Sequence, residues 1–210
     1  MAVFRHLSGS AVPAEQGIAL LVTLLMLVAV LLLGASAARM AMLGEKAARA
    51  ERDRYVAMQA AEDALADAEK EINGSAAGEP ARAALLAAGN GLGFVPGCGA
   101  GADNPALGLC AYGGGEAPVW EAVDIGDDSA ASRSVPFGQF TGAVMETGQG
   151  FLPFRRPRYI IERMPYHPPG EDAGSTHYLY RVTAIGFGAR ESTEVVLQGS
   201  FRQAEGGGAP

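Results

Sequence analysis

The stretch IALLVTLLMLVAVLLLGASAA, residues 18–38, decides how the rest of this chain can fold. It holds no charged residue, and its only polar side chains are those of Thr23 and Ser36. As an α-helix it would span roughly 31 Å, about the thickness of the hydrocarbon core of a bilayer. A helix is expected because lipid offers no hydrogen-bond partner to an open backbone. The stretch therefore predicts one transmembrane helix.

The same helix is predicted to continue beyond the membrane, because no proline or turn signal appears before Asn73-Gly74-Ser75. Residues 39–74 form this amphipathic continuation, and the whole helix would be roughly 80 Å long. The pairs Glu45–Arg49 and Asp67–Lys70 have the spacing of favourable ion pairs on the charged, solvated side. The apolar side recurs every three or four residues and includes Met58, Ala61, Leu65, Ala68 and Ile72.

Composition and charge limit what the remainder can be. The 210 residues leave room for one small domain after the helix, and the net charge of −7 at pH 7 argues against a basic surface for nucleic acid. The basic residues around residues 18–38 argue for a cytoplasmic C-terminal part, since only Arg5 precedes the span, whereas several Lys and Arg follow it closely. This distribution opposes an exported domain.

Residues 75–155 form a Gly-rich region that reads mostly as loop, apart from a short helix predicted at 80–88. The only two cysteines of the chain, Cys98 and Cys110, lie in this region. In an exported protein we expect them to form a disulfide, whose short loop would stabilise the fold by roughly 2–3 kcal/mol. A pair of free thiols is the alternative.

No catalytic constellation is found along the chain, and we expect neither a metal nor a cofactor. Asp124, Asp127 and Asp128 offer oxygen ligands for calcium, but their spacing differs from an EF-hand and a solvated acidic turn is the preferred interpretation. His167 and His177 flank a loop that contains two acids, at a spacing that is not typical of metal ligands.

Residues 156–203 predict an antiparallel sheet of at least three strands, at 158–164, 177–187 and 191–201, where β-branched and aromatic residues alternate with polar ones. One face is expected to pack on the apolar side of the helix, and the other to be covered by the Gly-rich region or left to solvent. The predicted fold class is therefore α+β, with a long N-terminal helix packed on a C-terminal antiparallel sheet. Residues 204–210 are predicted to be a disordered tail.

Three groups of residues resemble the PilX family of minor pilins, which are type IV pilus assembly proteins. The first is QGIALLV at 16–22, the second is RDRYVAMQAAEDAL at 52–65, and the third comprises RYIIE at 158–162 and YRVTA at 180–184. The second group is the most specific. The resemblance covers residues 1–72 and roughly the last fifty residues, whereas the middle of the chain matches no pattern of the family.

The resemblance implies a processed and assembled protein. Residues 1–17 would be a prepilin leader, Gly17 would precede the cut made by a prepilin peptidase, and Ile18 would become an N-methylated N-terminus. Before assembly the protein would cross the inner membrane once with its domain in the periplasm, because a pilin leader sets the topology despite the basic flank. After assembly it would belong to a pilus at the cell surface, with the major pilin, other minor pilins and a tip adhesin as partners.

Two positions depart from the pilin pattern. Val22 stands at the fifth mature position, where most pilins carry a glutamate that pairs with the free amine of a neighbouring subunit. Since an unpaired charge in an apolar core is costly, a subunit without this glutamate is best tolerated where no subunit lies ahead of it. The resemblance therefore implies a position at or near the tip and a role in starting assembly. Glu15-Gln16 stand where a basic residue is more usual, which could weaken recognition by the peptidase.

Other functions are compatible with the same features. A K-type pseudopilin of type II secretion also lacks the glutamate and lies at a tip, but such proteins normally carry a sizeable extra helical domain. A single-pass, membrane-anchored periplasmic binding module or enzyme would use the acidic segment or the histidine loop and keep its N-terminus uncleaved. If the protein were membrane-anchored but joined no filament, replacement of Gly17 would leave its localisation and function unchanged.

Overall fold

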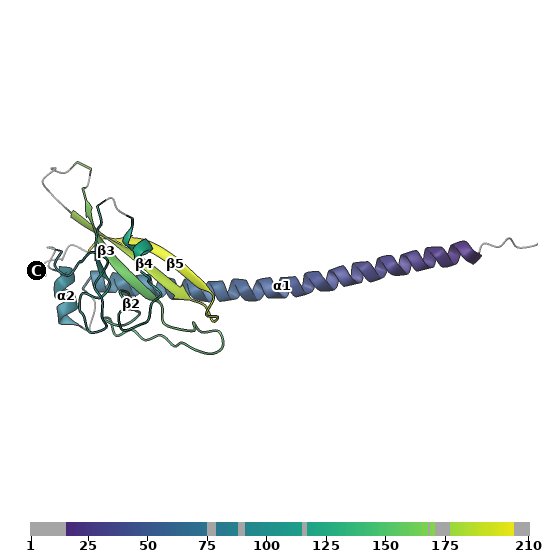
Figure 1. Cartoon of the computed structure of the whole chain (residues 1–210), viewed down its shortest axis with the longest axis horizontal. Coiled ribbons are helices and arrows are strands. Elements are labelled where there is room, and N and C mark those ends of the chain that lie inside the picture. Colours follow the sequence, from purple (N-terminus) through teal and green to yellow (C-terminus); the bar gives the residue numbers. More distant parts are fainter. Residues whose placement is uncertain are drawn as a thin grey trace, which may run out of the picture. The chain divides into compact units, whose positions relative to one another are not determined.

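The computed structural model describes residues 16–74, 79–87, 91–114, 117–167, 169–170 and 177–203. The chain divides into two compact units, residues 1–49 and 50–210, and helix α1, Gln16–Ile72, contributes to both (Figure 1). We call the second unit the head domain. Most of the predicted leader, up to position 15, and the predicted tail at 204–210 lie outside the described residues.

The head domain is built on one mixed sheet with the strand order β1-β3-β4-β5, and β2 pairs with β3 (Figure 1). Its three long strands are antiparallel neighbours, which confirms the three predicted strands: β3 Arg158–Tyr166, β4 His177–Phe187 and β5 Glu194–Phe201. The sheet is also larger than these three strands and is mixed, because β1, Leu109–Ala111, joins it parallel to β3. Strands as short as β1 and β2, Val135–Pro136, show no strand period in the sequence.

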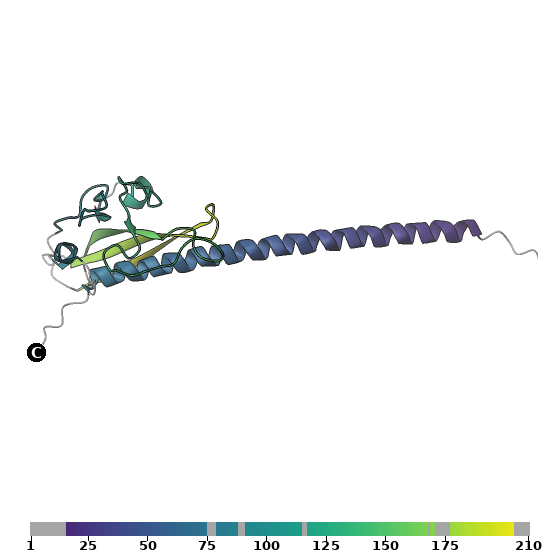
Figure 2. The same ribbon diagram turned by 90° about the horizontal axis from the view of Figure 1, so that it is seen from below.

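The second half of α1 packs along one face of the sheet, as predicted (Figure 2). Because alanine side chains are short, the helix backbone comes close to β4: a Cβ atom added at Gly186 would lie 2.1 Å from the carbonyl oxygen of Ala57. Met58 and Leu65, which were predicted on the apolar side, are only half-buried. The buried small residues, which we call the alanine stripe, are Ala57, Ala60, Ala61, Ala64 and Ala68.

The opposite face of the sheet is covered by the Gly-rich region, which decides between the two predicted alternatives. Ile160 of β3 and Phe187 of β4 point into a second core cluster there, whereas Tyr159 and Val182 face the cluster around α1. Two short helices belong to this region, α2 at Pro80–Ala87 and α3 at Val119–Ala122. The residues that cover this face are Cys98, Val119, Val123 and Ile125, which form the cluster together with Cys110 of β1.

Candidate functional site

The first candidate functional site is the apolar part of α1, which is exposed throughout. All residues from 18 to 38 are exposed, with Ile18 at 71% and Leu33 at 72%. The hydroxyls of Thr23 and Ser36 each donate to a carbonyl oxygen of the same helix at 2.9 Å. The segment therefore carries no side chain that requires water, and the helix is long and apolar enough to cross a membrane.

The predicted processing point lies in the first turn of α1. A Cβ atom at Gly17 would meet no atom within 4 Å, and the φ angle of Gly17 is not in the left-handed region. The fold of the described residues therefore does not require glycine at this position. Val22, one turn later, is 47% exposed.

Asp53 is the first buried residue of α1, and it joins the helix to the connection between β4 and β5. Its carboxylate accepts hydrogen bonds from the backbone N–H groups of Ala189 at 2.6 Å and Arg190 at 3.2 Å, and from the Thr193 hydroxyl at 2.5 Å. The Arg190 guanidinium donates to it at 2.9 Å. Burial by itself would raise the pKa of Asp53, but the hydrogen bonds from Thr193, Arg190 and Ala189 outweigh burial and lower it. Charge-assisted hydrogen bonds thus fix α1 to this connection.

Glu71 and Arg82 join the end of α1 to α2, and each side chain is almost wholly buried. Arg82 Nε donates to Glu71 Oε2 at 2.9 Å, and Arg82 Nη1 donates to the carbonyl oxygens of Pro105 and Leu107 at 2.9 and 2.7 Å. Burial raises the pKa of Glu71, and the charge of Arg82 opposes this rise. These contacts connect α2 and the loop before β1 to α1. Breaking the pair would be costly, because removal of one partner would leave a buried charge unpaired.

Tyr159 extends this network to β3. Its hydroxyl donates to Glu71 Oε1, and it lies 3.3 Å from Asp67 Oδ2. Asp67 also accepts from the backbone N–H of Gly138 at 2.8 Å and from the Thr141 hydroxyl. Burial and the nearby carboxylates of Glu71 and Asp67 hold the pKa of Tyr159 well above its ordinary value, so the phenol stays a neutral donor.

These buried acids were missed by the sequence analysis, although a signal for them was present. The predicted Glu45–Arg49 pair is confirmed, but the predicted Asp67–Lys70 pair is wrong, because Asp67 faces the sheet and is only 1% exposed. Asp53, Asp67 and Glu71 lie three or four residues from members of the alanine stripe, so helical periodicity places them on the buried side. Only the expectation that charged residues stay in solvent put Asp67 outside.

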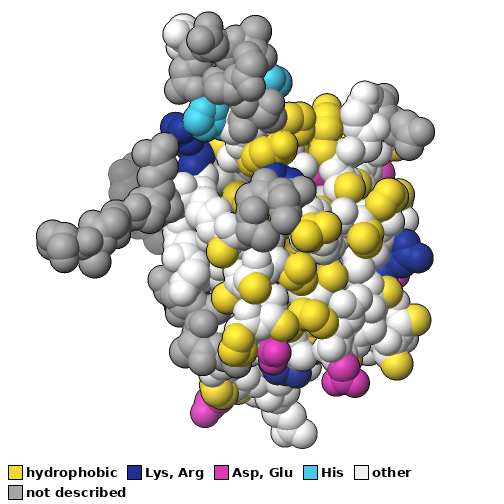
Figure 3. Space-filling view, turned by 90° about the vertical axis from the view of Figure 1, so that its left-hand side faces the viewer, with side chains coloured by type: hydrophobic (Ala, Val, Ile, Leu, Met, Phe, Trp, Pro, Cys, Tyr) yellow, Lys and Arg dark blue, Asp and Glu magenta, His cyan; other side chains and the backbone are white. Residues whose placement is uncertain are grey.

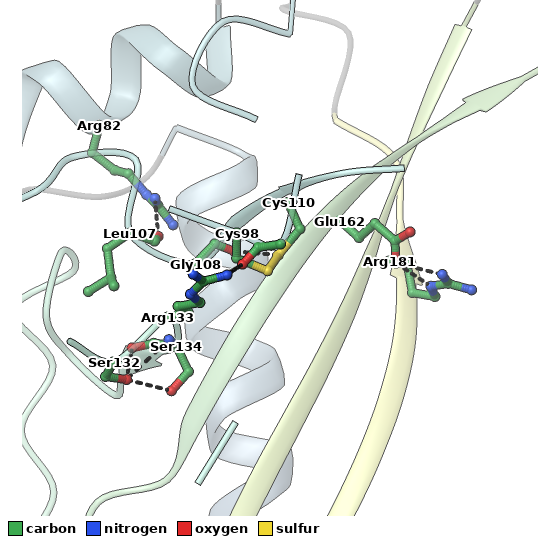
Figure 4. Close-up of a disulfide and its surroundings, with 11 residues drawn as sticks. Arg82, Cys98, Leu107, Gly108, Cys110, Ser132, Arg133, Ser134, Glu162 and Arg181 are labelled. Atoms are coloured by element: carbon green, nitrogen blue, oxygen red, sulfur yellow. Dashed lines mark hydrogen bonds and ion pairs between the residues drawn. A yellow bond between two sulfur atoms is a disulfide. The ribbon is translucent and has the colours of Figure 1, made fainter. Parts of the chain in front are cut away.

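The predicted disulfide between Cys98 and Cys110 is present (Figure 4). Cys110 belongs to β1 and is wholly buried, whereas Cys98 lies in the loop before it with a φ angle of 67°, which non-glycine residues rarely adopt. The bond therefore fixes an irregular loop to the edge strand of the sheet. On β3 and β4 beside it, Glu162 accepts a hydrogen bond from Arg181 Nε at 3.0 Å (Figure 4).

The acidic segment forms a turn in the described part of the chain. Asp124 and Asp127 each accept a hydrogen bond at 2.9 Å from the backbone N–H two residues further on, which is the arrangement of an acidic turn. Among the described residues, no group of three His, Cys, Asp or Glu side chains is placed to hold a metal ion. The loop between His167 and His177 lies mostly outside the described residues.

Comparison with known families identifies the chain. The family model described as PilX N-terminal matches residues 16–66, and the one described as type IV pilus assembly protein PilX C-term matches residues 95–203. The chain belongs to the PilX family. No curated protein and no solved structure gave a match.

In this PilX protein, the matched residues include Asp53 and its hydrogen-bond partners on the connection between β4 and β5. They also include the disulfide and the whole sheet. The match also extends over residues 95–155, where the sequence showed no pattern of the family. PilX proteins are pilus assembly proteins, and the exposed apolar helix of this one fits a membrane anchor.

Proposed function

We propose that this PilX protein is a minor pilin, cut between Gly17 and Ile18, that takes a place at or near the tip of a type IV pilus and helps to start its assembly. The observation that carries the proposal is the uniformly apolar and exposed surface of residues 18–38, in which Val22 occupies the fifth position after the cut. This surface fits a core made of packed helices as well as it fits lipid.

The charge of the new N-terminus is the reason for a tip position. Cutting leaves a methylated amine on Ile18, which is costly to bury in an apolar bundle unless a carboxylate lies beside it. The amine of this subunit can be paired by a glutamate of the subunit that follows. Val22 cannot pair with the amine of a subunit ahead. The free energy of the assembled filament is therefore lowest when this subunit lies where no subunit is ahead of it.

The disulfide and the surface of the head domain support export and assembly. A disulfide is typical of an oxidising compartment, so it favours a periplasmic head domain over the cytoplasmic one suggested by the basic residues after the span. Leu92 is 64% exposed and Tyr112 is 44% exposed. Hydrophobic side chains are also spread over the end of the domain where α2 lies (Figure 3). Such surfaces suit the proposed partners, the major pilin, other minor pilins and a tip adhesin.

The intact mass of the protein recovered from cells tests the processing step. We expect a chain that begins at Ile18 and carries the mass of one added methyl group. A chain that still begins at Met1 or Ala2 would overturn this step and favour an anchored periplasmic module.

Immunogold labelling of an epitope-tagged protein on sheared pili tests the position. We expect label at filament ends for the wild type, and label along the filament for Val22→Glu, which restores the carboxylate. Val22→Gln is the matched control, since it has nearly the same size without the charge and should keep the label at the ends. Wild-type label scattered along the filament would overturn the tip position.

A further inference from the structure

A pocket of about 400 Å³ opens in the head domain where the segment before β2 meets the start of β3. Its volume is in the range of small-molecule sites. We call it the arginine pocket, because three arginines within four residues of sequence contribute to its wall. The charged and polar side chains that line it are Arg155, Arg156, Arg158, Ser129, Ser132 and Gln139, together with Asp128.

Arg158 is the buried charge of the pocket, with 8% of its surface exposed. Its Nε donates to the Ser134 hydroxyl at 2.7 Å, and its Nη2 donates to the Ser132 hydroxyl and the Ser134 carbonyl oxygen, both at 2.7 Å. The two serine hydroxyls lie 3.2 Å apart (Figure 4). These partners are neutral, and no carboxylate of the described residues forms an ion pair with Arg158. Its Nη1 has no hydrogen bond within the part of the chain that the structure describes.

The one acid on the wall is already engaged with a different arginine. Asp128 lies 3.5 Å from Arg155 Nη1, and Arg155 Nη2 is also 3.9 Å from Glu194. The wall of the pocket therefore carries three arginines and one acid, Asp128, whereas Glu194 beside Arg155 and Asp127 near Arg158 do not line it. In a chain of net charge −7, a wall on which arginines outnumber acids favours an anion over a cation as the bound group.

Burial of Arg158 without an acidic partner has an electrostatic cost. Burial lowers the pKa of Arg158 below its ordinary value, and the charges of Arg155 and Arg156 act in the same direction, whereas those of Asp128 and Asp127 oppose it. An anion at Nη1 would remove this cost, since a charged hydrogen bond to a carboxylate or phosphate is the strongest that a guanidinium forms.

We infer that the arginine pocket binds a small ligand, about the size of a monosaccharide, through a carboxylate or phosphate group. Arg158 is the buried contact for the anionic group, and Arg156 adds charge at the exposed rim. The side-chain amide of Gln139 supplies a hydrogen bond for a further hydroxyl group of the ligand. This binding function is separate from filament assembly, which uses the apolar helix.

Titration calorimetry on the full chain in a neutral detergent tests the inference. The probes are inorganic phosphate, glucose 6-phosphate, glucuronate and, as the neutral control, glucose. We expect at least one anion to bind with a Kd of about 1 mM or lower, more weakly as salt rises, and glucose not to bind. Binding of glucuronate alone would assign a carboxylate ligand, and binding of the phosphates alone would assign a phosphate ligand. Equal binding of glucose and glucuronate, or no binding of any anion at about 10 mM, would overturn the inference.

Variants at the rim locate the binding without disturbing the buried Arg158. Arg156→Glu and Ala130→Glu change exposed residues of the pocket wall, and we expect each to weaken anion binding about tenfold or more. Arg54→Glu makes the same change of charge on an exposed residue of α1 outside the pocket, and it should leave the Kd within about twofold. Equal effects of all three would overturn the site. Since binding is measured on the purified chain, a failure here is distinct from a failure to assemble pili.

Discussion

At the scale of single residues, Gly186 decides how closely the sheet approaches α1. A Cβ atom at this position would lie 2.1 Å from Ala57 O and 2.4 Å from Ala61 N, which are backbone atoms of the helix. Because the helix would have to move as a whole, we expect Gly186→Ala to lower the free energy of unfolding by roughly 3 kcal/mol. Urea unfolding of the full chain in detergent measures this change, with the single tryptophan, Trp120, as the fluorescent probe.

Gly199→Ala on β5 is the matched control for this substitution. Its Cβ atom would meet the ring of Phe201 at 3.1 Å, and that ring can turn away. We expect a change within about 1 kcal/mol. Equal losses for the two variants would contradict a special closeness at Gly186.

Asp53 gives the stability of the head domain a dependence on acid pH. Burial opposes its charge, but hydrogen bonds from Thr193 and Arg190 outweigh burial and lower its pKa below the ordinary 3.8. The stabilisation is therefore fully present above about pH 5 and is lost as pH falls through the lowered pKa. We expect Asp53→Asn to cost roughly 2 kcal/mol at pH 7 and to flatten the fall in melting temperature below pH 5.

Circular dichroism melts between about pH 3 and 7 give this profile. Asp63→Asn changes an exposed acid of the same helix and should leave both the stability and the profile close to those of the wild type. An Asp53→Asn chain that unfolds with the wild-type acid profile would show that Asp53 does not control it.

At the scale of elements, the disulfide holds the loop before β1 against the sheet. Cys98 and Cys110 are twelve residues apart and both belong to the core cluster on the face away from α1. Reduction should lower stability by roughly 2–3 kcal/mol, or about 5–10 °C in melting temperature for a domain of this size. Because these are the only cysteines, a reductant acts on no other bond. A Cys98→Ser/Cys110→Ser chain should match the reduced wild type, and an unchanged melting temperature in both would contradict a stabilising role.

The length of an element decides whether the sequence predicts it. α1 and the strands β3, β4 and β5 are long enough for their periods to be recognised, so their type and their packing were predicted. β1 has three residues and β2 has two, and their pairing depends on segments far away in the chain. The arginine pocket was missed for a related reason, since its arginines become a site only where the segment before β2 lies beside β3.

At the scale of the whole molecule, the head domain has the features of an independent folding unit. It begins at Ala50, has a core on each face of its sheet, and includes every buried residue of α1, of which Asp53 is the first. A fragment of residues 50–210 should therefore fold as a soluble monomer, with Glu51 and Asp53 favourably placed in the first turn of its helix. The full chain should require detergent, because residues 18–38 expose a continuous apolar surface.

Light scattering after gel filtration and a circular dichroism melt test this prediction on the fragment, with the full chain in detergent as the reference. The fragment should melt within about 5 °C of the full chain. A fragment that aggregates or lacks a cooperative transition would show that the head domain depends on the N-terminal unit.

A force that pulls on the N-terminal part of α1 passes Arg52, whose guanidinium lies 3.9 Å from the ring centroid of Phe151, and then reaches Asp53, the first buried residue of the helix. The load then falls on hydrogen bonds to Ala189, Arg190 and Thr193, which weaken steeply once donor and acceptor separate. Behind them the alanine stripe offers close contact but little apolar area. The joint is therefore stiff over a short extension and yields abruptly beyond it, and acid that protonates Asp53 lowers the force at which it yields.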